Sequence, residues 1–148
     1  MYKLVVTLFL TCSALAGFAK EYKIEMLNKS NGQTMVFKPM FLKANIGDVV
    51  TFVPTTKGHI SQSVYTPKDA NTWKGITSKE VKVTLNKEGI YIYKCQNHGI
   101  MGMAGVIQIG KPTNLKEVKK FYSGFKKKLI MNKVRLDKII NDLKNTSN

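Results

Sequence analysis

The sequence predicts a mainly β protein, an antiparallel sandwich or barrel followed by two C-terminal α-helices. Three observations support this prediction. Short runs of alternating apolar and polar residues fill residues 20–110, and Gly, Pro and Asn separate them. No long helical pattern occurs in that range. From residue 115 onward, the apolar residues recur at helical spacing instead.

Six strand-like runs occur between the turn signals of the β-rich part. These signals include Asn-Ile-Gly at 45–47 and Asn-Lys-Glu-Gly at 86–89, residue types that favour tight turns. The predicted strands are 22–26, 35–37, 48–53, 80–85, 90–94 and 105–109.

The last part of the chain predicts two amphipathic helices, at about 115–122 and 126–144, with Ser123-Gly124 between them. We expect their apolar faces to pack on the sandwich. Residues 111–148 carry 11 basic and 3 acidic residues. A basic helix lying on a membrane surface is therefore the alternative, although such charges more often occupy a solvated face.

Residues 1–19 have the pattern of a secretory signal peptide, with a charged start, a short apolar run and small residues ending at Ala19. The run is shorter than the about 20 apolar residues that a membrane span needs. We expect cleavage after Ala19, with Ala16 as the alternative site, and export into the periplasm. The competing interpretations are a buried N-terminal strand and an uncleaved anchor. Cleavage would leave Cys95 as the only cysteine.

The composition excludes several classes of protein. The chain has 24 Lys and Arg residues against 9 Asp and Glu, a net charge of +15, but only 2 His and 2 Cys. Two histidines cannot ligate a multi-copper cluster, and two cysteines cannot make a disulfide-dense scaffold. The basic residues are scattered without a nucleic-acid-binding motif, so we expect no nucleic-acid partner.

One segment carries the chemistry. Cys95, His98 and Met103 follow a predicted strand within nine residues, and His59 lies upstream after a Lys-Gly pair. Two imidazoles and a thiolate in a near-trigonal set, with a weak axial thioether, form a type 1 (blue) copper site. Sulfur suits Cu(I) and imidazole suits both Cu(I) and Cu(II). We therefore predict one copper ion bound by these four residues.

Other assignments of the same residues stay open at this point. Met101 lies nearer to His98 in sequence and is the alternative axial ligand, although we favour Met103. Zinc accepts one cysteine and two histidines, but it normally takes a fourth Cys, His or carboxylate ligand. A lone cysteine is also often only a small buried hydrophobe.

The chain resembles the cupredoxins, and among them the pseudoazurins, over nearly its whole length after residue 19. The resemblance rests on seven segments in order: 26–29, 35–39, 43–48, 51–54, 57–59, 93–95 and 98–103. It implies a Greek-key β-sandwich at 20–110 that binds copper, with a helical extension at 111–148. It also implies a periplasmic carrier of single electrons rather than an enzyme.

Two departures from the pseudoazurin pattern concern the metal site. Pseudoazurins usually have Asn directly after the first histidine, where it bridges the two ligand loops, but this chain has Ile60. They commonly have Thr-Pro between the cysteine and the second histidine, where this chain has Gln96-Asn97. Hydrogen bonds around the ligands tune a metal site, so these departures bear on the potential and on loop rigidity.

The resemblance also implies a docking face. Lys29, Lys57, Lys74 and Lys94 are expected around an apolar patch beside the exposed histidine His98, where they would steer acidic redox proteins. Copper nitrite reductase, other periplasmic reductases, c-type cytochromes and oxidases are candidate partners of a monomeric carrier without stable membrane insertion. Copper storage or delivery is the alternative function, which Met101 and Met103 leave open.

Overall fold

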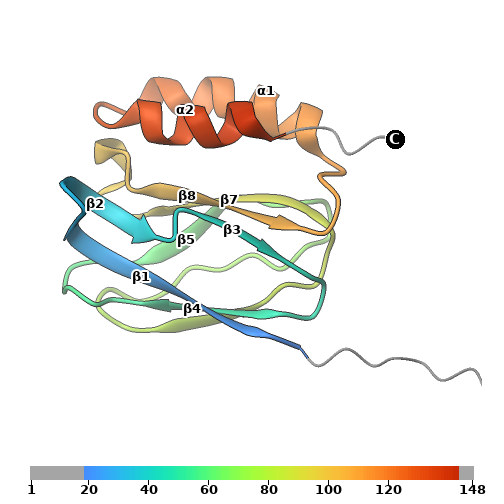
Figure 1. The fold of residues 1–148 in the computed structure, drawn as a ribbon, viewed down its shortest axis with the longest axis horizontal. Coiled ribbons are helices and arrows are strands. Elements are labelled where there is room, and N and C mark those ends of the chain that lie inside the picture. Colours follow the sequence, from blue (N-terminus) through green and yellow to red (C-terminus); the bar gives the residue numbers. More distant parts are fainter. Residues whose placement is uncertain (1–18, 144–148) are drawn as a thin grey trace, which may run out of the picture.

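Two four-stranded sheets face each other in the computed structural model, which describes residues 19–143 (Figure 1). The first sheet has the strand order β2-β1-β4-β6, and the second has the order β3-β8-β7-β5. The strands are β1 (Glu21–Ser30), β2 (Gln33–Lys38), β3 (Phe41–Ala44), β4 (Val49–Val53), β5 (Ser61–Tyr65), β6 (Val81–Thr84), β7 (Gly89–Cys95) and β8 (Ala104–Ile109). This architecture confirms the prediction of a mainly β sandwich. The signal peptide predicted at 1–19 lies, apart from Ala19, outside the described residues.

The pairing is mixed, so the expectation of antiparallel pairing is wrong for two of the six strand pairs. β1 pairs with β4 and β3 pairs with β8 in parallel, whereas the other neighbouring strands are antiparallel. The chain changes sheets repeatedly after β2, so neighbours in a sheet are often not consecutive in sequence. Only strands joined by a short hairpin must run antiparallel.

Sequence patterns missed two strands, β3 and β5. β3 is only four residues long, and β5 reads Ser-Gln-Ser-Val-Tyr, which lacks an apolar alternation. β5 is a strand because β7 supplies its hydrogen-bonding partner, with Ser61 opposite Cys95. Tertiary pairing therefore overrides weak intrinsic preference here.

Aromatic side chains fill the space between the sheets. The Tyr93 ring lies with its centroid 4.8 Å from that of Phe37 and 5.0 Å from that of Phe52, both edge to face. Phe52 also stacks on Trp73 at 5.5 Å. Burying each such ring stabilises the fold by roughly 1.5–3 kcal/mol. Because Tyr93 is two residues before Cys95, this cluster also anchors the end of β7.

Two helices cover the outer face of the second sheet (Figure 1). α1 (Leu115–Phe125) packs on β7 and α2 (Lys133–Asp142) packs on β8, with the short 3₁₀ turn η2 (Lys126–Lys128) after α1. Their buried apolar residues are Leu115, Val118, Tyr122, Phe125, Leu136 and Ile140. None of the helices in residues 19–143 is long and apolar enough to cross a membrane.

The predicted bounds of both helices need correction. α1 continues through Ser123-Gly124 to the buried Phe125, and the Ser123 hydroxyl donates to the Lys120 carbonyl at 2.8 Å, so this serine is accommodated within the helix. α2 begins at Lys133 rather than at residue 126. Leu129 is extended and Asn132 has a left-handed φ of 55°, which separates α2 from the preceding turn.

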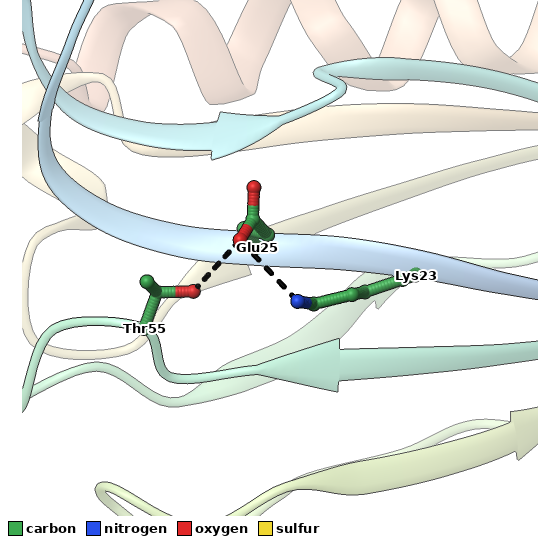
Figure 2. Close-up of polar contacts among 3 residues, drawn as sticks. All are labelled: Lys23, Glu25 and Thr55. Carbon is green, nitrogen blue, oxygen red and sulfur yellow. Dashed lines mark hydrogen bonds and ion pairs between the residues drawn. The ribbon is translucent and has the colours of Figure 1, made fainter.

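A surface contact ties β1 to the segment that follows β4. Figure 2 shows Glu25 of β1, whose Oε1 accepts a hydrogen bond from the Thr55 hydroxyl at 3.2 Å and lies 3.4 Å from Lys23 Nζ. Such exposed pairs contribute little to stability. The next residue, Thr56, adds a backbone hydrogen bond to the Met26 carbonyl at 3.1 Å. Together these contacts hold the segment that leads to His59 against β1.

Close packing at Gly105 provides a test of this core. A Cβ at residue 105 would overlap the Tyr93 hydroxyl group. We expect Gly105→Ala to lower the free energy of unfolding by about 1–3 kcal/mol, the usual cost of overpacking. Gly124→Ala in α1 is the matched control, because nothing lies within 4 Å of its added Cβ. It should raise stability by about 0.5–1 kcal/mol. Equal unfolding midpoints of the two variants in urea would contradict the packing described.

Candidate metal centre

Three ligand atoms converge at one end of the sandwich. Cys95 is the last residue of β7, His98 precedes the 3₁₀ turn η1 (Gly99–Met101), and His59 lies on the connection from β4 to β5. The His59 and His98 Nδ1 atoms are 3.2 Å apart, and the Cys95 Sγ lies 3.9 Å from the former and 3.6 Å from the latter. These three residues form a group able to hold a metal ion.

The size of this triangle fits a single metal ion. A triangle with edges of 3.2, 3.6 and 3.9 Å has its equidistant point about 2.1 Å from each corner. Nitrogen and sulfur ligands bind metals at roughly 2.0–2.3 Å. The three donors are therefore placed for one ion in a near-trigonal arrangement.

The loop from Cys95 to Met103 closes on itself through its backbone. The Cys95 amide donates to the Met103 carbonyl at 2.9 Å, and the Met103 amide donates to the His98 carbonyl at 3.3 Å. Cys95 and Met103 are fully buried, whereas Met101 is half-buried on η1. This closure favours Met103 over Met101 as the residue beside the three donors.

His59 is oriented by its second ring nitrogen. Its Nε2 lies 2.9 Å from Asn28 Oδ1 and 3.1 Å from Thr56 Oγ1, and Thr56 Oγ1 accepts a hydrogen bond from the Asn28 amide. Donation from Nε2–H to the Asn28 oxygen leaves the Nδ1 lone pair free to face a metal. Burial, and to a lesser extent the neighbouring His98, lower the pKa of His59, so its ring is neutral at pH 7.

Asn97, one of the departures from the pseudoazurin pattern, joins the two ligand loops through its side chain. The Asn97 Nδ2 donates to the Gly58 carbonyl at 2.8 Å, directly before His59. Ile60, where pseudoazurins usually have Asn, is buried in the core, and its carbonyl accepts from the Gln96 amide at 3.2 Å. The two ligand loops are thus bridged, but the side-chain donor is Asn97, between Cys95 and His98, and not the residue that follows His59.

The C-terminal helix also contacts the ligand loop. The Arg135 guanidinium of α2 donates to the Gly102 carbonyl at 3.2 Å and to two β2 carbonyls, of Thr34 at 3.0 Å and Met35 at 3.2 Å. Asn132 Nδ2 donates to the Met101 carbonyl at 2.9 Å. Because Gly102 and Met101 separate His98 from Met103, these bonds restrain the loop between two candidate ligands.

Comparisons with known proteins agree with this donor set. Residues 24–110 match the family of copper-binding proteins described as plastocyanin/azurin. The chain belongs to this family. A pseudoazurin from Paracoccus pantotrophus is 38% identical over 109 residues, which cover 72% of this chain and 75% of that protein. The resemblance to pseudoazurins predicted from the sequence is confirmed.

Solved structures of pseudoazurins have the same fold. That of the native pseudoazurin from Hyphomicrobium denitrificans has a TM-score of 0.65 at 47% identity and covers 67% of this chain and 82% of its own. That of the pseudoazurin from Methylobacterium extorquens AM1 has a TM-score of 0.71 at 32% identity and covers 84% of this chain and the whole of its own. The helices after β8 are thus part of a cupredoxin fold of pseudoazurin type.

Of the four lysines expected on a docking face, two lie on segments that lead to the donors and two lie on neighbouring segments. Lys29, Lys57 and Lys74 are exposed and Lys94 is half-buried. Two are next to site residues, Lys57 before Gly58 and Lys94 before Cys95, where the Lys94 stem covers Gly99. Lys29 follows the His59 partner Asn28, and Lys74 bridges to Gln62 of β5.

Sequence reasoning missed the residues that hold the donors in place. In the sequence, Asn28 stands out only as part of a segment that matches pseudoazurins, and Asn97 only as a departure from their pattern. Thr56, Asn132 and Arg135 carried no signal, because their contacts join parts of the chain that are distant in sequence. A hydrogen-bonding side chain in a loop shows no periodicity that would reveal its partner.

The bridge from Asn97 is testable. We expect Asn97→Ala to lower the stability of the copper-free protein by about 0.5–1.5 kcal/mol, the usual net value of a hydrogen bond. Loss of such a bond around a metal site costs roughly 10–100-fold in affinity, so copper transfer to a chelator should accelerate. Gln96→Ala is the control, because among residues 19–143 its side chain makes no hydrogen bond. Copper release at the same rate from both variants would contradict the role of Asn97.

The contact from α2 predicts a separate effect. Arg135→Met should lower the free energy of unfolding by about 1.5–3 kcal/mol, the value of hydrogen bonds to a charged group. It should also speed hydrogen exchange of the amides of residues 101–103. Arg135→Lys keeps the charge but loses the fork of donors, so partial rescue is expected. Lys138→Met on the same helix controls for loss of charge, and an equal effect there would contradict this role.

Proposed function

We propose that this protein is a type 1 copper protein that carries single electrons, with His59, Cys95, His98 and Met103 as the copper ligands. The observation that supports this most directly is the triangle of two imidazole nitrogens and one cysteine sulfur, whose size suits a single ion. Membership of a copper-binding family supports copper over zinc. The buried Met103 completes the donor set with a thioether, which suits copper.

The residues around the site support electron transfer rather than catalysis. Copper supplies a centre that alternates between Cu(II) and Cu(I). His59 and Cys95 are fully buried, which excludes water, whereas His98 is partly exposed and connects the site to the surface. The whole sequence has two histidines and both lie here. A second, catalytic metal site would lack imidazole ligands, so we propose a carrier and not an enzyme.

We propose the periplasm as the place of action, reached through a signal peptide at 1–19. The charged start, short apolar run and small residues before Lys20 support this assignment. Residues 20–110 would then form the copper-binding domain and residues 111–148 its helical extension. The match of residues 24–110 to a copper-binding family supports the bounds of the first part.

The partners that we propose are acidic redox proteins, such as copper nitrite reductase, other periplasmic reductases, c-type cytochromes or oxidases. The docking residues that we propose are Lys29, Lys57, Lys74 and Lys94. Lys57 and Lys94 lie on segments that lead to the site, and all four would steer such proteins toward His98. Without its first 19 residues the chain keeps a net charge of +14. That charge opposes self-association and supports a monomer that makes transient contacts.

The ligand assignment and the function share one test. Addition of Cu(II) to the protein should produce an intense thiolate-to-copper absorption band, and ascorbate should bleach it reversibly. Cys95→Ser should abolish the band, and Met103→Leu should change the intensity of the band. Met101→Leu is the matched control and should keep the wild-type spectrum. Tight copper binding without the band would instead support copper storage or delivery.

A further inference from the structure

Exposed apolar side chains gather at the metal end of the molecule. Six large apolar residues of 19–143 are strongly exposed, and four of them lie on η1, on the junction between η2 and α2, or in the first turn of α2. These four are Ile100 (56% exposed), Ile130 (74%), Met131 (47%) and Val134 (77%), which we call the apolar ridge. Clustered exposed apolar groups mark interaction sites more often than singly scattered ones.

The apolar ridge is attached to the ligand loop by its backbone. The amides of Ile130 and Met131 both donate to the Ile100 carbonyl, at 2.7 and 3.4 Å. Gly102 lies so close to this junction that a Cβ there would come within 2.5 Å of the Met131 carbonyl oxygen. The chain joining α1 to α2 thus lies at the same end as η1 (Figure 1). Since Ile100 is two residues after His98, the ridge borders the exposed ligand.

The charges around the apolar ridge are mainly positive. Residues 126–136 contain four lysines and Arg135, and of these lysines Lys126 is paired with Asp137 at 2.7 Å. Lys127 and Lys128 are exposed and Lys133 is half-exposed at the start of α2. A partner that covers the ridge therefore needs an apolar centre with acidic groups at its edge.

We propose that the apolar ridge is a contact surface for an acidic redox protein, and that it extends the docking face around His98 onto the C-terminal extension. This inference rests on the proposed electron-carrier function. The ridge places apolar contact directly beside the ligand loop, where a transient complex needs the shortest path for the electron. The lysines beside the ridge, Lys127, Lys128 and Lys133, add to the steering by Lys57 and Lys94.

Two other occupants fit the observations less well. A second copy of this chain would bring two strongly basic surfaces together, which the charge opposes. A lipid bilayer would require a free amphipathic helix. The apolar side of α2 is instead buried on the sandwich through Leu136 and Ile140. The ridge itself is not a free helix, because the backbone of Ile130 and Met131 is hydrogen-bonded to Ile100 of the ligand loop.

The test uses copper-loaded protein with a copper nitrite reductase and an acidic c-type cytochrome as probes. Ile130→Ser and Val134→Ser should each slow the bimolecular electron-transfer rate by about 3- to 10-fold with at least one probe, equivalent to about 0.7–1.4 kcal/mol. The slowing should persist at high salt, because it removes apolar contact rather than charge. The rate with the small oxidant hexacyanoferrate should stay within twofold of wild type.

Ile46→Ser is the matched control. Ile46 is 61% exposed and follows β3, whose last residue pairs with Ile109 at the far end of β8 from Met103. Its variant should react with both probes at the wild-type rate. Far-ultraviolet circular dichroism and the visible band of each variant should match wild type, since the substituted side chains are on the surface.

Several results would overturn the proposal. If Ile130→Ser and Val134→Ser react normally with both probes while Lys57→Ala and Lys94→Ala react slowly, docking occurs without the apolar ridge. Wild-type protein could also dimerise in sedimentation experiments or bind to anionic phosphatidylglycerol vesicles. If Ile130→Ser abolishes either behaviour, the ridge contacts a second copy of the chain or a membrane instead of a redox protein. If wild-type protein lacks the visible band, the electron-carrier function itself fails, and the proposal fails with it.

Discussion

The structure depends on bringing one cysteine and two histidines from distant parts of the chain to a common point. His59 and Cys95 are 36 residues apart, yet their ligand atoms lie within 3.9 Å. The pairing of β5 with β7 makes this possible, because it sets Ser61 opposite Cys95 and so fixes where His59 lies. The aromatic cluster around Tyr93 then holds the end of β7 in place. The sandwich is in this sense a scaffold for a triangle of three atoms.

The contacts that support the three donor atoms come from three separate parts of the chain. Asn28 of β1 fixes the ring of His59, Asn97 ties the two loops together, and Arg135 of α2 restrains the loop before Met103. Each uses a side-chain donor or acceptor against a ring nitrogen or a backbone carbonyl. Shared restraint of this kind keeps the donor geometry constant, and a constant geometry limits the reorganisation that electron transfer requires. The C-terminal helix α2 is thereby part of the metal centre's support.

Sequence patterns were most reliable where a local signal existed. Alternating runs predicted β1, β4 and β7, and the short spacing from Cys95 to Met103 predicted that these residues share a loop. The patterns failed at β5, whose polar residues form a strand only because β7 lies beside them. They also misplaced the start of α2, which depends on the left-handed backbone of Asn132. The expected antiparallel pairing is wrong for β1 with β4 and for β3 with β8, because strand direction follows from how the chain changes sheets.

The sequence alone determined the kind of chemistry. Two histidines, Cys95 and a nearby methionine leave few other metals or sites to consider, since donor type and number are properties of composition and spacing. The tertiary structure alone decided how those donors are held and what surrounds them. The bridge from Asn97, the contact from Arg135 and the apolar ridge beside Ile100 each join segments that are distant in sequence. Such contacts depend on three-dimensional packing, which leaves no local pattern along the chain.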